Sequence, residues 1–341
     1  MRAVQISGVK TLEETTIAEP KSHDGYVVVE LKKTGICGSD IHYWDMGNPK
    51  GLVMGHEICG VVVDPGSRDD LKVGDRVTAL PISPCLKCDA CKSGNVQACT
   101  ETWTHGLGLS LDNPGGYAEF TSIRPDMVVK VPNNITDSEV AMVEPSAVSL
   151  HAVNLADFKI GCSVLVIGAG IIGQLAAMFA KMKGASYVAI SEANAKRGKK
   201  AVDLGVADEY FLATDEKFQT NIREKCKDGY DIIIDCCGNS PALSSAIMAG
   251  KPRAQIVLVG LSMEPVTIPS ALILMREFKV LGAAGYTYNE FVKCIELMAN
   301  RKIDTLKFVD DVVGFKDVQK AFKRLTSGED SAIKILIDPK K

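Results

Sequence analysis

The sequence lacks the features that would place the chain in a membrane or on a nucleic acid. No run of apolar residues approaches the ~20 needed to span a bilayer, and the N-terminal stretch MRAVQISGVKTLEETT holds no apolar core of signal-peptide length. There is no basic block, and the formal net charge of the 341 residues is −3. Nothing therefore indicates a surface that neutralises phosphates. We expect a soluble, cytoplasmic protein that acts on a small molecule.

Cysteine, in contrast, is abundant, with eleven residues in the chain. Four of them fall in the stretch CLKCDACKSGNVQAC, with gaps of two, two and seven residues. Short gaps let a loop curl around one ion, and four thiolates close a tetrahedral zinc site without an open position. An iron–sulfur cluster, or cysteines without a metal, are the alternatives. We predict a structural zinc site formed by Cys85, Cys88, Cys91 and Cys99.

The pattern of the sequence changes near residue 160. Before it, short β-like runs such as YVVVELKKTG and GVVVDPG alternate with turns, which is typical of a compact β-rich domain. After it, apolar strands alternate with helices, which predicts an α/β domain with a parallel sheet covered on both faces. From about residue 285 the pattern shifts again. The segments FKDVQKAFKRL and SAIKILI predict a helix and a strand that pack back on the first domain.

The α/β region opens with GAGIIG, placed directly between an apolar strand and a helix. Its glycines, Gly168, Gly170 and Gly173, match the G-x-G-x-x-G turn that binds a dinucleotide pyrophosphate. Glu192, at the end of the next strand, could accept hydrogen bonds from a ribose and would repel a 2′-phosphate. NAD is therefore favoured over NADP, although Arg197 and the lysines near it weaken this inference. A strand–helix turn that binds nothing is the alternative.

Residues 35–60, GICGSDIHYWDMGNPKGLVMGHEICG, contain a dense group of metal-binding residue types. A catalytic zinc needs about three protein ligands and an open position for water or substrate oxygen. Cys37 offers the thiolate and His56 the imidazole. The third ligand is either Glu57 or a later carboxylate, for which Glu144 in VEPSAVSLHAV is the natural candidate. Asp40 could accept a hydrogen bond from the free nitrogen of His56.

Taken in order, these motifs resemble the zinc-dependent medium-chain dehydrogenases, in the branch of sorbitol, threonine and butanediol dehydrogenases. The resemblance rests on GICGSDIH, GHEICGVV, GDRV, the four-cysteine segment, GGYAEF, VEPSAVSLHAV, VLVIGAGIIG and VLVGL, and runs over nearly the whole chain. It implies a GroES-like catalytic domain (residues 1–148, completed by 285–341), a Rossmann NAD-binding domain (149–284) and an active site in the cleft between them. It also implies a catalytic zinc at Cys37, His56 and Glu57, with Glu144 at the second acidic position.

The resemblance further implies that the chain oxidises a secondary alcohol to a ketone, with zinc promoting alkoxide formation and NAD accepting the hydride. The proton would leave through Ser39 and His42, and the expected cofactor contacts, beyond the glycines, are Ile171, Ile172, Glu192, Arg197 and Leu261. Gly285 stands before Tyr286, where polyol-oxidising relatives commonly carry arginine, which favours a smaller vicinal diol or hydroxy-carbonyl compound over sorbitol. A threonine-type or sugar-acid dehydrogenase, a zinc-free reductase of this fold, and a non-enzymatic NAD sensor are the alternatives.

Two further expectations are less specific. By resemblance the chain is a homodimer or homotetramer, and the apolar run from Ala254 to Leu261, followed by TIPSALILM, could supply an edge strand or be buried within one subunit. Aromatic residues and a histidine that could line the substrate pocket are Trp44, Trp103, His105 and Tyr286.

Overall fold

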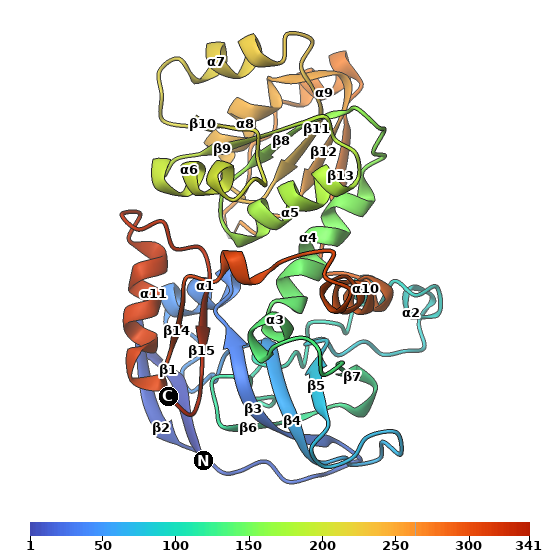
Figure 1. Ribbon diagram of the computed structural model, residues 1–341, viewed down its shortest axis with the longest axis vertical. Helices are drawn as coiled ribbons and strands as arrows, with labels where there is room; N and C mark the ends of the chain where they lie inside the picture. Colours follow the sequence, from blue (N-terminus) through green and yellow to red (C-terminus); the bar gives the residue numbers. More distant parts are fainter. Residues whose placement is uncertain (263) are drawn as a thin grey trace. The chain divides into compact units, whose positions relative to one another are not determined.

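The structure is a computed structural model that describes residues 1–262 and 264–341. It divides the chain into two compact units, both drawn in Figure 1. Unit 1 consists of Met1–Ala147, Tyr286–Ser327 and Lys334–Lys341. Unit 2 consists of Val148–Gly285 and Gly328–Ile333. Unit 1 is thus assembled from both ends of the polypeptide.

The core of unit 1 is a seven-stranded sheet with the order β14-β15-β3-β4-β5-β7, in which β6 also pairs with β3. Strand β3 is the centre of this sheet, and its residues Val27, Val29 and Leu31 are buried on one face, as alternation along a strand requires. A separate hairpin, β1-β2, begins the chain. The strands of unit 1 are β1 (Arg2–Gly8), β2 (Thr11–Thr16), β3 (Val27–Gly35), β4 (Glu57–Asp64), β5 (Arg76–Ala79), β6 (Phe120–Ile123), β7 (Val128–Lys130), β14 (Asp311–Val313) and β15 (Ile335–Ile337).

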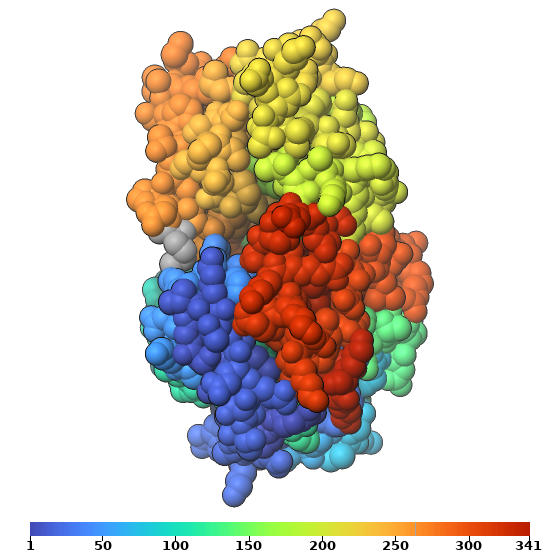
Figure 2. Space-filling model, turned by 90° about the vertical axis from the view of Figure 1, so that its left-hand side faces the viewer, coloured from blue at the N-terminus to red at the C-terminus, as the bar shows by residue number. Residues whose placement is uncertain are grey.

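Most of the C-terminal segment belongs to unit 1. Helix α11 (Val318–Thr326) buries Val318, Phe322 and Leu325 on one face. Its Gln319 binds the hairpin, because the side-chain oxygen accepts a hydrogen bond from the Leu12 N–H at 2.8 Å. Figure 2 shows the result as a red C-terminal segment lying beside the blue N-terminal segment. Strand β15 pairs with β3.

Unit 1 carries few and mostly short helices. The other α-helices are α1 (Gly38–Met46), α2 (Asp89–Lys92), α3 (Asp137–Ala141) and α10 (Tyr288–Ala299), and the 3₁₀ turns are η1 (Val96–Ala98), η2 (Pro125–Met127), η3 (Leu306–Phe308) and η4 (Phe315–Asp317). Helix α4 (Val143–Leu155) contains the boundary between the units. Across the described residues of both units, no helix has the length and apolar character needed to cross a membrane.

Unit 2 is built on a six-stranded parallel sheet with the order β10-β9-β8-β11-β12-β13. The order reverses between β8 and β11, which is the strand arrangement of a doubly wound dinucleotide-binding domain. Its strands are β8 (Ser163–Ile167), β9 (Tyr187–Glu192), β10 (Glu209–Leu212), β11 (Tyr230–Asp235), β12 (Gly250–Leu258) and β13 (Lys279–Gly282). Its helices are α5 (Ile171–Met182), α6 (Ala195–Asp203), α7 (Phe218–Lys225), α8 (Ser240–Ile247) and α9 (Ser270–Arg276).

The possibility that the run from Ala254 to Leu261 forms a sheet edge is wrong. Most of this run belongs to β12, which lies between β11 and β13 and is hydrogen-bonded on both sides. Its apolar character reflects burial within the sheet, as expected for an interior parallel strand. The edge strand on this side of the sheet is β13, whose side chains are mostly exposed.

Candidate active site and cofactor-binding residues

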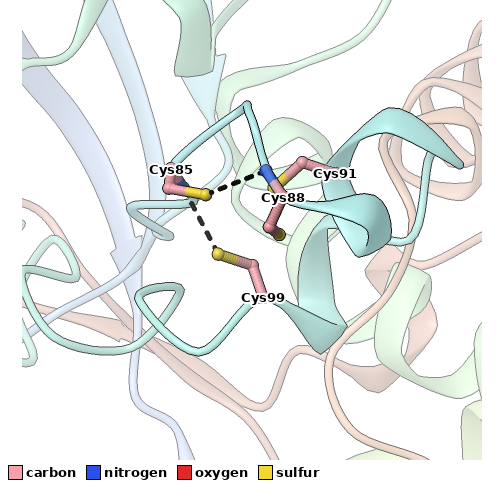
Figure 3. A group of neighbouring side chains, drawn as sticks. All are labelled: Cys85, Cys88, Cys91 and Cys99. Atoms are coloured by element: carbon pink, nitrogen blue, oxygen red, sulfur yellow. Dashed lines mark hydrogen bonds between the residues drawn. The ribbon is translucent and has the colours of Figure 1, made fainter.

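The four cysteines of the lobe converge on one point. Their sulfur atoms all lie within 4.8 Å of one another (Figure 3). Backbone N–H groups point at two of them, because the Cys85 N–H donates to Cys99 Sγ at 3.3 Å and the Cys88 N–H to Cys85 Sγ at 3.4 Å. Such donors favour the thiolate, and the N–H bonds from Cys85 and Glu101 lower the pKa of Cys99 to about 6. The group fits a tetrahedral zinc ion.

The second predicted site gathers at the end of β3 and the start of β4. Cys37 is the N-cap of α1, which also carries Ser39 and Asp40, and His56 directly precedes β4. Ser39 Oγ lies 3.4 Å from His56 Nε2, and Asp40 Oδ1 lies 3.6 Å from His56 Nδ1. The imidazole is thus held between a carboxylate on one side and the Ser39 hydroxyl on the other. Burial lowers the pKa of His56, but the charges of Asp40 and Cys37 outweigh it and raise that pKa well above its ordinary value.

A buried tyrosine holds the Asp40 carboxylate in place. Tyr117, in the loop before β6, donates a hydrogen bond from its hydroxyl to Asp40 Oδ2 at 2.7 Å. The same oxygen accepts the Cys37 N–H at 3.0 Å. Both Tyr117 and Asp40 are fully buried. The chain of contacts from Tyr117 through Asp40 fixes the ring of His56 from the side opposite Ser39.

The two acidic candidates for the third zinc ligand differ in their partners. Glu57 is buried and forms an ion pair with the buried Lys334. Glu144, on α4, lies near His56 and Tyr286, and its burial raises the pKa of its carboxyl to about 7. Tyr286 is buried beside it, and burial followed by the charge of Glu144 raises the pKa of its phenol well above the ordinary value.

The residue types at this site suit a zinc ion, although among the described residues only the four cysteines of the lobe bring three or more ligand atoms within 4.8 Å of one another. Among the described residues, Glu57 Oε1 is buried without a hydrogen-bond partner. A buried carboxyl whose pKa rises toward neutrality, as that of Glu144 does, lacks a neighbouring positive charge sufficient to offset its burial. A divalent cation bound to thiolate, imidazole and carboxylate would supply that charge, and this donor set is one that zinc accepts.

The glycine turn of unit 2 has the geometry that a dinucleotide requires. Gly168 has φ +95°, which side chains other than glycine rarely adopt. A Cβ at Gly173 would lie 1.9 Å from the Gly168 carbonyl oxygen, so only glycine fits there. A Cβ at Gly170 would meet nothing within 4 Å, which leaves the backbone at the start of α5 open to a phosphate. Ile171 and Ile172 form the first turn of α5 and are partly exposed.

The other predicted cofactor contacts differ in where they lie relative to this turn. Glu192 ends β9, and its carboxylate accepts hydrogen bonds from the Ala169 N–H at 2.6 Å and the Asn194 N–H at 2.8 Å. It therefore stands directly beside the glycine turn. Arg197 lies in the first turn of α6. Leu261 follows β12 and is largely exposed.

Of the remaining predicted residues, two lie in contacts that account for their side chains without a substrate. Trp44 is buried and its ring packs against Phe322, with centroids 5.6 Å apart. His105 is exposed and pairs with Asp112, with His105 Nδ1 2.5 Å from Asp112 Oδ2. Trp103 is exposed. His42 lies on α1, one turn after Ser39, and is partly buried.

Sequence reasoning missed two residues of this site. Lys334 was present in SAIKILI as a single charge within an otherwise apolar strand, and a buried charge of this kind needs a partner. That signal indicates a buried ion pair, although it does not identify Glu57. Tyr117 was present only as part of GGYAEF, where nothing distinguishes it from an ordinary core aromatic residue.

The chain matches known proteins over nearly its whole length. Residues 23–133 match the family model of the alcohol dehydrogenase GroES-like domain, and residues 172–300 match that of the zinc-binding dehydrogenase. The sorbitol dehydrogenase of Bombyx mori is 32% identical over 98% of this chain and 97% of its own length. A probable D-xylulose reductase A of Aspergillus fumigatus is 32% identical over 95% of this chain and 92% of its own.

Comparison with solved structures points to the same group of proteins as the sequence relatives. The crystal structure of 2R,3R-butanediol dehydrogenase from Bacillus subtilis is similar with a TM-score of 0.87 and 28% sequence identity, and the match covers 99% of each chain. The fold is therefore a GroES-like domain combined with a Rossmann domain, which confirms the predicted fold class.

The protein is an oxidoreductase of the alcohol dehydrogenase type and uses zinc and a nicotinamide dinucleotide. More particularly, the chain belongs to the zinc-dependent medium-chain dehydrogenases, in the branch that contains the sorbitol and butanediol dehydrogenases. The resemblance predicted from its motifs is confirmed.

Proposed function

We propose that the chain oxidises a vicinal diol or a short polyol to the corresponding hydroxy-ketone, with NAD as the hydride acceptor and zinc at Cys37, His56 and one of the two glutamates. In this assignment unit 1 is the catalytic domain and unit 2 the cofactor domain. The observation that carries the proposal is the group of metal-ligand residue types at the end of β3 and the start of β4, with the Ser39 hydroxyl 3.4 Å from His56 Nε2.

The role of each residue at this site follows from its position. Zinc bound there would act as a Lewis acid on the alcohol oxygen, and a nicotinamide would accept the hydride. Ser39 stands beside the metal-binding imidazole, where its hydroxyl can take the proton that the alcohol loses. His42 lies on the same face of α1, three residues later, and an imidazole has the pKa range suited to passing a proton to water.

Gly285 supports a small substrate. Tyr286 is buried beside Glu144, and the residue that precedes it has no side chain that could bind a distant hydroxyl. Of the relatives named above, the butanediol dehydrogenase acts on such a short diol according to its name, whereas the sorbitol dehydrogenase and the xylulose reductase act on longer polyols.

A panel of alcohols tests this proposal. NAD reduction is measured with 2,3-butanediol stereoisomers, sorbitol, xylitol, threonine and sugar acids at equal concentrations. We expect the highest kcat/KM with a vicinal diol of few carbons and a lower value with sorbitol. Activity confined to threonine or a sugar acid would replace the proposed substrate class, and no activity with any alcohol would contradict the proposed site.

We also propose that the chain works in the cytoplasm as a homodimer or homotetramer. Cysteines that bind zinc as thiolates are typical of a reducing compartment, where disulfides are rare. The exposed edge strand β13 and the neighbouring helix α9, with Leu274 79% and Met275 81% exposed, offer an apolar surface for a second copy. Sedimentation analysis of the wild type and of Leu274→Asp tests this, and a monomeric wild type would contradict it.

A further inference from the structure

A short segment near the C-terminus, residues 328–333, belongs to unit 2, although the segments before and after it belong to unit 1. Helix α11 precedes this segment and β15 follows it, so the chain anchors the segment at both ends. Gly328, its first residue, has φ +71°, and Ala332 and Ile333 near its end are buried. We call this segment the C-terminal strap.

The C-terminal strap binds the start of helix α6. The side-chain amide of Asn194 donates from Nδ2 to the Gly328 carbonyl oxygen at 2.8 Å and to the Asp330 carbonyl oxygen at 2.9 Å. Lys196 Nζ donates to the carbonyl oxygen of Glu329 at 2.6 Å. Three consecutive carbonyl groups of the strap thus accept hydrogen bonds from the N-cap and the first turn of α6.

Asn194 uses both ends of its amide. Its Oδ1 caps α6 by accepting the Lys196 N–H at 2.9 Å and the Arg197 N–H at 3.3 Å, while its Nδ2 binds the strap. The reverse orientation would bring the amide N–H groups against the N–H groups of the helix, so these contacts permit one orientation only. Serine or aspartate caps a helix about as well as asparagine, but neither can donate both hydrogen bonds to the strap.

The same residue holds the carboxylate of Glu192. Glu192 Oε1 accepts the Asn194 N–H at 2.8 Å, and Glu192 Oε2 accepts the Ala169 N–H of the glycine turn at 2.6 Å. The carboxylate is therefore fixed between the glycine turn and Asn194. Because the strap fixes the side chain of Asn194, it also restrains the backbone N–H that binds Glu192.

We propose that the C-terminal strap, acting through Asn194, positions the Glu192 carboxylate for the adenosine ribose of the cofactor. Asn194 is a positioning residue in this arrangement and does not itself bind the cofactor. The proposal rests on the proposed function, because it presupposes NAD at the glycine turn with Glu192 at the ribose. It implies that a loosened strap weakens the binding of NADH more than that of NADPH, since only NADH offers the carboxylate a free 2′-hydroxyl.

Fluorescence titrations of the full-length chain with NADH and with NADPH test the proposal. Asn194→Ser keeps the cap of α6 and loses the hydrogen bonds to the strap. We expect it to weaken NADH binding by about fivefold or more and to change the NADPH affinity by less than about twofold. Gly328→Ala forces alanine into φ +71° and so displaces the strap from its own side. The same selective loss is expected, which keeps the proposal testable if Asn194→Ser does not fold.

Two further variants make the test specific. Gly205 has φ +70° and, like Gly328, nothing within 4 Å of an added Cβ, but it follows the opposite end of α6. Gly205→Ala should therefore lower the Tm about as much as Gly328→Ala and leave the NADH affinity unchanged. The double variant Glu192→Gln/Asn194→Ser should bind NADH no more weakly than Glu192→Gln alone, because Asn194 acts through Glu192.

The outcomes separate this proposal from the proposed function. If Asn194→Ser binds NADH as tightly as the wild type, or loses affinity for NADH and NADPH by the same factor, the role of the strap is overturned while the cofactor site stands. An equal loss of NADH affinity in Gly205→Ala and Gly328→Ala also overturns it, because backbone strain alone would explain both. If the wild type does not bind NADH, the proposed function itself fails, and the proposal about the strap fails with it.

Discussion

The hydroxyl of Tyr117 donates a hydrogen bond of 2.7 Å to Asp40, the carboxylate that faces the imidazole of His56. Tyr117→Phe removes this donor without changing the shape of the core. We expect a loss of about 2 kcal/mol in the free energy of unfolding, since a buried hydrogen bond to a charged group is lost. We also expect about tenfold weaker zinc binding at the Cys37 site, because His56 is less firmly oriented.

Thermal unfolding and chelator competition measure these two effects. Tyr230→Phe is the matched control, because Tyr230 is equally buried, but its hydroxyl makes a long 3.5 Å hydrogen bond to the Ile222 carbonyl oxygen in unit 2 and no bond to a carboxylate that faces His56. The control should lose less than about 1 kcal/mol and keep its zinc affinity. Equal zinc affinity in Tyr117→Phe and wild type would show that Asp40 does not need the tyrosine.

Alanine substitutions at two glycines of the turn are expected to have different effects. Gly173→Ala should destabilise unit 2 by about 1–3 kcal/mol, because its Cβ would collide with the Gly168 carbonyl oxygen. Gly170→Ala should leave stability unchanged, since the added methyl meets nothing within 4 Å, yet weaken NADH binding by keeping the pyrophosphate away from the backbone. Unfolding curves and NADH fluorescence titrations distinguish the two. Unaltered NADH affinity in Gly170→Ala would argue against a phosphate at this turn.

Glu192 is predicted to set the preference for NAD. Its carboxylate stands at the turn, bonded to the Ala169 N–H, where a 2′-phosphate would meet its negative charge. Glu192→Gln should reduce the ratio of NADH to NADPH affinity by about tenfold, which corresponds to roughly 1.4 kcal/mol. Asp203→Asn, which removes a charge that is paired with Lys199 at the C-terminal end of α6, is the control for loss of one charge. An unchanged ratio of NADH to NADPH affinity in Glu192→Gln would mean that other residues set the preference for NAD.

The buried carboxyl of Glu144 should make the free energy of unfolding of the metal-free protein depend on pH. Burial raises the pKa of its carboxyl from an ordinary 4.5 to about 7. Between these values the folded chain holds a proton that the unfolded chain has released, so the free energy of unfolding falls as the pH rises through this window. The contribution lost is about 3 kcal/mol at most, at roughly 1.4 kcal/mol per pH unit.

Denaturant unfolding of the metal-free protein at pH 5 and pH 8 measures this effect. Glu144→Gln should remove that part of the pH dependence, whereas Glu224→Gln, an exposed glutamate on α7, should not. A pH dependence that is the same in Glu144→Gln and wild type would mean that Glu144 ionises normally.

The parts of the structure that could be predicted from the sequence are those encoded over short distances along the chain. The strand, glycine turn and helix from Ser163 to Met182 are contiguous, and so are the four cysteines within fifteen residues of each other. Their chemistry can be deduced from spacing alone. The C-terminal strand was also predictable, because SAIKILI is too apolar to remain exposed.

The parts that could not be predicted depend on pairing between distant segments. Lys334 and Glu57 are 277 residues apart, and only the register of β15 on β3 brings them together. Strand β10 and helix α7 were not indicated because they are short and carry few buried residues, so their periodicity is weak. The choice between Glu57 and Glu144 as a zinc ligand could not be predicted for the same reason. Residue type alone does not reveal which carboxylate already has a partner from a distant segment.

Zinc content tests the central claim most directly. Metal analysis of the wild type, of Cys37→Ser and of Cys99→Ser should give about two zinc ions per chain in the wild type and about one in each variant. NAD reduction should be lost in Cys37→Ser. A wild type with zinc only at the four cysteines, or a Cys37→Ser variant that keeps its second zinc ion and its activity, would contradict a catalytic metal at the end of β3.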